Sequence, residues 1–207
     1  MRCPHADSSA RAQFIDIVED IDDIELHLEF AYVRQAHCLL EGPVRVFIHS
    51  GFQILQPAGY VIFFAEQNDE TRIVPLDNRP HVGQDIKLWQ GDSRGHWEGN
   101  TLVIDVTNVK AKSRLDMVGN FYSPSAHFVE RLTVVDDQTI NYEATITDPT
   151  VYTRPWKLTA HFVRRFPNGS DYELYEDACH EGERTADDLV ISSAAKKSST
   201  VKKVSKN

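Results

Sequence analysis

The side chains best suited to chemistry cluster in residues 88–106. Glycines recur there at positions 91, 95 and 99, and charged or aromatic residues surround them: Trp89, Asp92, Arg94, His96, Trp97 and Glu98. Glycines at this spacing favour a backbone that bends sharply or adopts positive φ angles. Tryptophan rings bury a large apolar area while keeping one polar atom, which suits the rim of a pocket. We therefore predict a loop at the mouth of a cavity, held in place by a strand over residues 101–106.

A serine within this stretch fits a hydrolase motif. Residues 91–95 read G-x-S-x-G around Ser93, the pattern of the nucleophile elbow, in which a strained strand-to-helix turn exposes the serine. Asp148 and His180 follow in the order that such a triad requires. A strand rather than a helix is expected after Ser93, so a serine hydrolase is a minor alternative, and a tight turn is the simpler interpretation.

A second group of candidates lies in residues 127–131, where charged side chains interrupt a β-rich run. His127 is a candidate general acid or base, because an imidazole titrates near neutral pH. Glu130 and Arg131 point to opposite faces of a regular strand, so at most one of them enters the interior. A solvent-exposed ion pair and a structural histidine remain the alternatives.

Residues 148–156 contain two prolines, which favour an extended connection between strands. Tyr152, Arg154 and Trp156 alternate along it and so share a face. Such a trio can stack on a ligand and bind its oxygen atoms, or Arg154 can simply cover Trp156 as a structural cation–π pair.

Residues 175–182 carry side chains of the types that ligate metals: Glu176, Cys179, His180 and Glu181. Their spacing matches no zinc signature. A composite metal site would have to draw on histidines that are scattered along the chain, at positions 81, 96, 127 and 161. We therefore predict no metal site and keep His180 as a candidate acid or base.

The elements that must position these residues are mostly short strands. Runs rich in β-branched and aromatic residues alternate with turn residues, which is typical of an antiparallel meander. The predicted strands are 44–49, 52–55, 60–66, 71–75, 97–106, 127–135, 139–147, 156–164 and 172–175. Apolar residues at helical spacing predict one helix over residues 12–36, broken near positions 22–23.

The fold class expected from these elements is mainly β, an antiparallel barrel of the lipocalin or calycin kind, because closure removes exposed edges. Residues 76–95 and 108–126 are the expected mouth loops. We expect one domain over residues 12–190, a disordered N-terminus at 1–11 and a disordered basic tail at 191–207.

Composition narrows the class of partner. The 207 residues are 41% hydrophobic and 26% charged, with a net charge of −9, which disfavours nucleic acid as a partner. Three separated cysteines form no disulfide framework. With no apolar leader or membrane-length run, we expect a cytoplasmic protein that does not act at a membrane and binds a small molecule, with a homo-oligomer left open.

Several segments resemble motifs of a large family of uncharacterised bacterial proteins. Residues 77–81 are similar to its D-x-R-P-H, 91–105 to G-D-S-R-G-x-W-E-G-D-T-L-V-V-D, 127–131 to H-x-x-E-R, 142–156 to a segment with D-D-P-x-x-Y-T-x-P-W, and 175–182 to Y-E-x-x-C-H-E-G. Residues 38–45 resemble C-L-P-x-G-x-P-R with departures at Leu40, Glu41 and Val44, and Asn100 stands where the family has aspartate. The resemblance implies a bacterial protein and supports these site positions, while it carries no activity.

We expect an acid–base enzyme of the lyase or isomerase type, a dehydratase or cyclase, acting on a small, largely apolar molecule in the barrel cavity. No phosphate loop, dinucleotide fingerprint or haem motif occurs, so no cofactor is expected. The predicted proton donors and acceptors are His127, Glu130, Asp92 and His180. Arg94 and Arg154 are expected to stabilise negative charge. The predicted substrate-binding aromatic residues are Trp89, Trp97, Tyr142, Tyr152 and Trp156. The alternative is a non-catalytic, lipocalin-like binding protein with the same pocket.

Overall fold

The protein is mainly β in a computed structural model that describes residues 13–17, 40–47, 51–113, 115 and 120–164. Its strands are β1 (Gln13–Ile17), β2 (Phe52–Leu55), β3 (Tyr60–Ala65), β4 (Thr71–Pro75), β5 (Asp92–Glu98), β6 (Thr101–Thr107), β7 (His127–Val134), β8 (Thr139–Thr147) and β9 (Trp156–Val163). The described helices are two short 3-10 turns, η1 (Arg45–Phe47) and η2 (Gln67–Asp69). No helix in the described part of the chain is long and apolar enough to cross a membrane.

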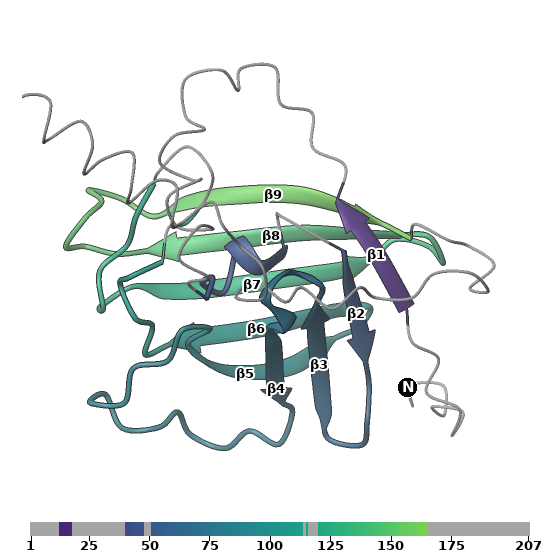
Figure 1. Cartoon of the computed structure of the whole chain (residues 1–207), viewed down its shortest axis with the longest axis horizontal. Coiled ribbons are helices and arrows are strands. Elements are labelled where there is room, and N and C mark those ends of the chain that lie inside the picture. Colours follow the sequence, from purple (N-terminus) through teal and green to yellow (C-terminus); the bar gives the residue numbers. More distant parts are fainter. Residues whose placement is uncertain (1–12, 18–39, 48–50, 114, 116–119, 165–207) are drawn as a thin grey trace, which may run out of the picture.

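All strand pairs are antiparallel and follow the order β4-β3-β2-β1-β9-β8-β7-β6-β5. Strands β2–β4 form one group and β5–β9 the other, and Figure 1 shows β2–β4 crossing the direction of the longer strands. Strand β1 connects the groups, because residues 13–15 pair with β2 and residues 16–17 pair with β9.

The two edge strands, β4 and β5, meet through their side chains. Arg72 Nε donates to Ser93 Oγ at 3.1 Å. A Cβ atom added at Gly95 would lie 2.6 Å from Val74 Cγ1, so glycine allows the two edges to approach this closely. No backbone ladder joins β4 to β5 in the described residues. The sheet therefore curves round without closing into a hydrogen-bonded barrel there.

The glycine-rich stretch is a hairpin and not the predicted mouth loop. Its first half is β5, which pairs with β6 from Asp92↔Thr107 to Glu98↔Thr101. The predicted single strand over 97–106 was therefore wrong. Gly99 opens the two-residue turn with φ +63°, as glycine does in hairpin turns. The alternation of small or apolar residues with charged ones along β5 was the strand signal that the glycines obscured.

Two further predictions about elements need correction. Residues 13–17, placed in the predicted helix, form β1, and the remainder of that segment lies outside the described residues. Pairing with β2 and β9 overrides the helical spacing there. The predicted strand 44–49 instead contains η1, which lies inside the curved sheet. Strands β2, β4 and β8 have the predicted bounds, and the predictions for β3, β7 and β9 are confirmed apart from one residue at the C-terminal end. The predicted strand 172–175 and both terminal segments lie outside the described residues.

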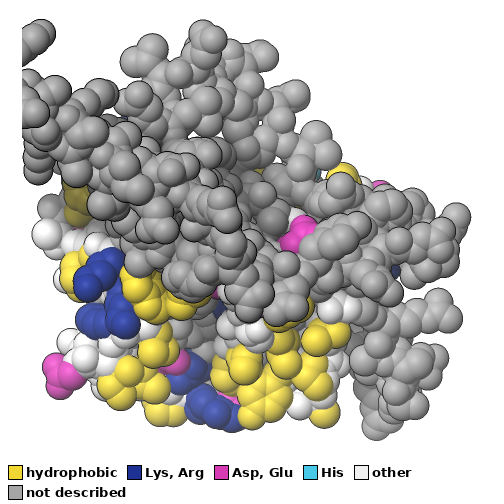
Figure 2. All heavy atoms as spheres, in the orientation of Figure 1, with side chains coloured by type: hydrophobic (Ala, Val, Ile, Leu, Met, Phe, Trp, Pro, Cys, Tyr) yellow, Lys and Arg dark blue, Asp and Glu magenta, His cyan; other side chains and the backbone are white. Residues whose placement is uncertain are grey.

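The core lies on the concave face of the sheet. Alternate residues of β7 and β8, such as Phe128, Glu130 and Tyr142, are buried there. Phe47 of η1 lies at the centre, with its ring 4.9 Å from Phe63 and 5.1 Å from Phe52 between centroids. The side chains on the outer face of the sheet differ between the two groups of strands. Polar residues dominate on β7–β9, whereas hydrophobic side chains gather over β2–β4 (Figure 2), where Ile73 is 54% exposed.

Candidate functional site

Four side chains form a continuous hydrogen-bonded chain on the outer face of β5–β7. His81 Nδ1 lies 2.8 Å from Asp92 Oδ2, and His81 Nε2 lies 2.7 Å from Asp105 Oδ1. The other Asp105 oxygen, Oδ2, lies 2.6 Å from His127 Nε2. We call Asp92, His81, Asp105 and His127 the His–Asp chain.

Strand register explains why these residues meet. Asp105 pairs with Arg94 on one side and with Val129 on the other, so its side chain lies on the outer face, two residues from His127 along β7. Asp92 begins β5 on the same face. His81 comes from the loop between β4 and β5, residues 76–91, which lies over this face.

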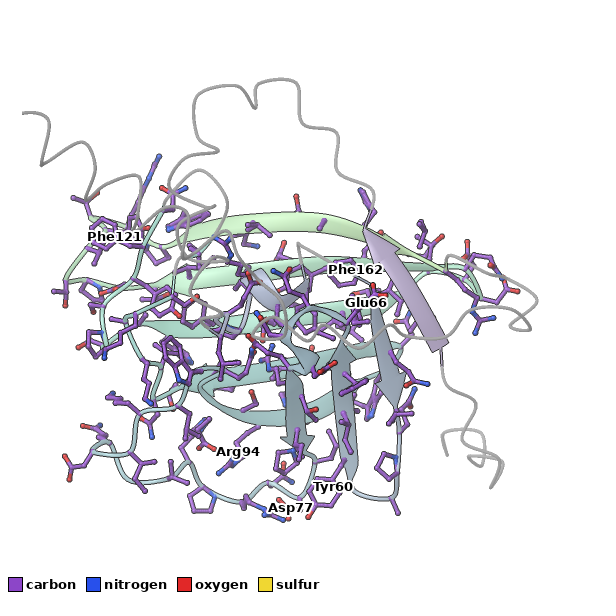
Figure 3. The ribbon with its side chains drawn as sticks, viewed as in Figure 1. Tyr60, Glu66, Asp77, Arg94, Phe121 and Phe162 are labelled. Carbon is purple, nitrogen blue, oxygen red and sulfur yellow. The ribbon has the colours of Figure 1, made fainter. Side chains whose placement is uncertain are left out.

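Arg94 fastens the 76–91 loop to the sheet. Its guanidinium donates to the carbonyls of Arg79 and Pro80 and to Asp92 Oδ1, the last at 2.7 Å. In Figure 3 Arg94 lies beside the loop segment that carries Asp77. Since Nε, NH1 and NH2 all donate to protein acceptors, Arg94 has a positioning geometry and not that of an open anion site.

Three members of the His–Asp chain have shifted pKa values. The hydrogen bond to Asp105 raises the pKa of His127 above its ordinary value, against the opposing effect of partial burial. The same bond, with a smaller contribution from His81, lowers the pKa of Asp105. For Asp92, burial is the largest single effect and favours protonation, but the Val82 amide, His81 and Arg94 together lower its pKa. Both carboxyl groups are therefore ionised at neutral pH.

Of the two histidines in the His–Asp chain, His127 is the more exposed. Its side chain is 41% exposed. Its second ring nitrogen, Nδ1, has no hydrogen-bond partner among the described residues. One nitrogen is thus oriented by a carboxylate while the other has no partner in the described part of the chain, which is an arrangement that a general acid or base can use.

Glu130, the other half of the predicted acid–base pair, lies on the opposite face of β7. It is fully buried and bidentate with Arg72: NH1 donates to Oε1 at 3.1 Å, and NH2 donates to Oε2. Tyr142 donates its hydroxyl to Glu130 Oε1 at 2.6 Å. Burial, together with the Glu130 charge, raises the pKa of Tyr142 well above its usual range. Glu130 and Tyr142 therefore belong to an interior ion-pair network and do not share a site with His127.

The remaining predicted residues are dispersed. Arg154 is exposed on the connection before β9, and His180 lies outside the described residues. Tyr152 and Trp156 pack edge to face, 5.6 Å apart, and Tyr152 donates to the Phe121 carbonyl. Trp97 is 39% exposed at the β5–β6 turn, and Trp89 lies under Lys110 Nζ at 5.3 Å. The predicted aromatic residues do not line one pocket in the described structure.

Ser93 does not lie on a nucleophile elbow. It is inside β5, buried, and its Oγ accepts from Arg72. The elbow mechanism needs an exposed serine on a strand-to-helix turn, and neither feature is present.

Asp105 was not among the predicted site residues, and His81 was predicted only as one of several scattered histidines. A signal for Asp105 was present, because it is the one charged residue in the apolar run 101–106. The D-x-R-P-H motif at residues 77–81 includes His81, but the 76–91 loop has no periodicity that would place it against Asp92 and Asp105.

A second polar cluster lies where residues 40–47 enter the sheet. Glu70 accepts from the Glu41 amide and from Gln90 Nε2, and Arg45 Nε donates to Glu41 Oε1 at 2.8 Å. Burial raises the pKa of Glu70 to about 8, and the adjacent Glu41 charge reinforces this against the opposing Glu41 amide. Burial also raises the pKa of Glu41, against the effect of Arg45.

This cluster predicts a pH-dependent stability. Because the folded pKa of Glu70 lies above its ordinary 4.5, folded Glu70 keeps a proton that the unfolded chain has lost between pH 4.5 and about 8. Stability should therefore fall across that window, by at most about 1.4 kcal/mol per pH unit. In urea unfolding, we expect the free energy of unfolding of Glu70→Gln to increase relative to that of the wild type as the pH rises from 5 to 8. An equal difference at both pH values would contradict this.

A surface groove and the arrangement of metal-ligating side chains bear on which ligands the protein can bind. A groove of about 430 Å³ lies on the outer face of β7–β9 and is lined by Arg131, Thr133, Asn141, Tyr142, Glu143, Thr159, Ala160 and His161. Within the described ranges, no group of three or more His, Cys, Asp or Glu side chains is arranged to hold a metal ion.

No protein-family model, curated protein or solved structure matches the chain. The resemblance to the bacterial family therefore stays a prediction, and the function has to be argued from the geometry of the site.

Proposed function

We propose that the protein is an acid–base enzyme of the lyase or isomerase type that needs no cofactor, with His127 as its proton donor and acceptor. The observation that carries the proposal is the 2.6 Å contact between His127 Nε2 and Asp105 Oδ2, which leaves Nδ1 without a hydrogen-bond partner among the described residues. A carboxylate that orients an imidazole and stabilises its cation is a recurrent device in acid–base catalysis.

The chemistry uses the raised pKa of His127, which increases the fraction of imidazolium at a given pH. In a dehydration, the imidazolium donates its Nδ1 proton to the departing hydroxyl, which leaves as water. The neutral ring then accepts the proton released from the neighbouring carbon, so the catalyst returns to its starting state. An isomerisation uses the same two transfers without loss of water.

The 76–91 loop supports a small, largely apolar substrate. Its side chains Val82, Ile86 and Leu88 are 36%, 52% and 40% exposed. Asn108 donates to the carbonyls of Val82 and Gly83, which holds this part of the loop at the end of β6. An apolar surface on the loop that the His–Asp chain ties to this face suits a hydrocarbon body that carries one hydroxyl or carbonyl group.

The proposal also covers the type of barrel, the cellular location and the partner. We propose that the sheet is an incompletely closed, lipocalin-like barrel. Aromatic side chains pack its described interior, so we place the reaction on the outer face and not in the lumen. We also propose a cytoplasmic, bacterial protein whose partner is a small molecule; the net charge of −9 supports this against nucleic acid.

A non-catalytic binding protein is the second candidate. The groove on β7–β9 favours it, because Thr133, Asn141 and His161 place hydrogen-bonding groups around one volume without an oriented acid–base pair. In that case turnover is absent and a ligand binds to the groove.

The test is a turnover screen with a panel of small hydroxylated and carbonyl-bearing terpenoid and polyketide-like compounds. We expect His127→Gln to reduce kcat/KM by about 10²–10⁴-fold, the usual contribution of a general acid or base. The matched control is His96→Gln, since His96 is an exposed histidine of β5, two strands from His127, and pairs with Glu98. Equal turnover in both variants, or no turnover by the wild-type protein, would contradict the proposal.

A further inference from the structure

His81 lies between two carboxylates, and this position bears on its protonation state and its role. Each of its ring nitrogens lies against a carboxylate oxygen, Nδ1 at 2.8 Å from Asp92 and Nε2 at 2.7 Å from Asp105. A neutral imidazole has one N–H donor and one lone pair, whereas an ionised carboxylate has only lone pairs. A neutral His81 would thus direct a lone pair at a carboxylate oxygen.

The other partners of the two carboxylates leave them no proton to supply. Asp92 accepts from the Val82 amide at 2.9 Å and from Arg94 NH1 at 2.7 Å. Asp105 accepts from His127 through its second oxygen. Groups that accept two or three donors favour their ionised form. Both contacts of His81 are satisfied together only when both ring nitrogens carry a proton.

We propose that His81 is a doubly protonated, bridging cation that joins Asp92 to Asp105 and so positions Asp105 for His127. The inference rests on the proposed function for the role of His127, but not for the state of His81. The charged groups that face the His81 ring are Asp92 and Arg94 of β5, Asp105 of β6 and, across Asp105, His127 of β7. Asp77 and Arg79 of its own loop pair with each other.

The bridge has two consequences. It ties the 76–91 loop, with its apolar side chains, to the face that carries His127. It also divides one carboxylate between two cations, one on each oxygen of Asp105, so the protonation of His81 opposes that of His127. His81 is therefore a positioning residue that also regulates the acid strength of His127.

The state of His81 can be read directly from the full-length protein. Long-range ¹H–¹⁵N spectra distinguish a histidine with two protonated nitrogens from either neutral tautomer, and His81→Gln, His127→Gln and His96→Gln assign the signals. At pH 7.5 we expect two protonated nitrogens on His81. A signal of either neutral tautomer would overturn the proposal.

A second measurement tests the positioning role. Glutamine at position 81 carries no charge, so His81→Gln should move the titration midpoint of His127 upward, by roughly half a pH unit or more. His96→Gln should leave that midpoint unchanged. An unchanged midpoint in His81→Gln would overturn the coupling. These outcomes are separate from the fate of the proposed function, which fails if His127→Gln retains turnover whatever the state of His81.

Discussion

Glu130→Ala should destabilise the protein by about 3–5 kcal/mol, the cost of leaving one member of a buried ion pair alone. The variant leaves the Arg72 guanidinium without a charged partner. This group is 2% exposed and loses both of its hydrogen bonds to the carboxylate. Arg72 keeps Ser93 Oγ and the Pro43 carbonyl as acceptors, but neither is charged. Tyr142 loses its acceptor as well. Urea unfolding monitored by tryptophan fluorescence measures the loss.

Two variants make this result specific. Glu143→Ala removes the carboxylate of a largely exposed pair with Lys157 on the adjacent strands, and should cost no more than about 1 kcal/mol. Tyr142→Phe removes one hydroxyl but leaves the ion pair, and should cost about 1–3 kcal/mol. If Glu130→Ala costs no more than Glu143→Ala, Arg72 is solvated in solution and the interior network is not closed.

Phe47→Ala should be comparably destabilising, at about 3–5 kcal/mol, because it empties the centre of the core. The Phe47 ring is fully buried and also lies 5.6 Å from Tyr142 and 5.9 Å from Phe162. Arg72 Cζ is 5.5 Å from its centroid, so the ring also covers the interior ion pair. The residues around it come from both groups of strands, which limits how far the core can collapse into the space.

Phe121→Ala is the matched control for this prediction. Phe121 is 51% exposed, so its truncation should change the free energy of unfolding by less than about 1 kcal/mol. Similar losses in the two variants would show that the 40–47 segment does not fill the interior. Chemical denaturation of both proteins under the same conditions gives the comparison.

Sequence patterns predicted the strands well where alternation was regular. Strand β8 alternates apolar and polar residues over nine positions, so its bounds followed directly, whereas the alternation alone did not decide which face lies inside. Residues 13–17 were harder, since five residues carry too little pattern to distinguish a strand from a helix turn. The 44–47 segment is rich in valine and phenylalanine because it lies inside the sheet as a 3-10 turn, and this composition does not distinguish such a turn from a buried strand.

The candidate site could be predicted only in part. The hypothesis placed His127 and Asp92 in one site, and the structure brings them into one chain through Asp105 and His81. It placed Glu130 there too, although the three-residue spacing from His127 already put the two on opposite faces of a strand. The contribution of His81 depends on how an irregular loop lies over the sheet, and no periodicity in the sequence encodes that path.

The central claim is that His127, oriented by Asp105, is the titrating catalytic group. The most direct test is the pH dependence of kcat/KM for wild type and Asp105→Asn, with whichever compound the wild-type protein turns over fastest. Asp105 raises the pKa of His127, so removal of its charge should move the limb that reports His127 to lower pH and reduce the maximum rate. A profile whose limbs stay in place in Asp105→Asn would contradict the account.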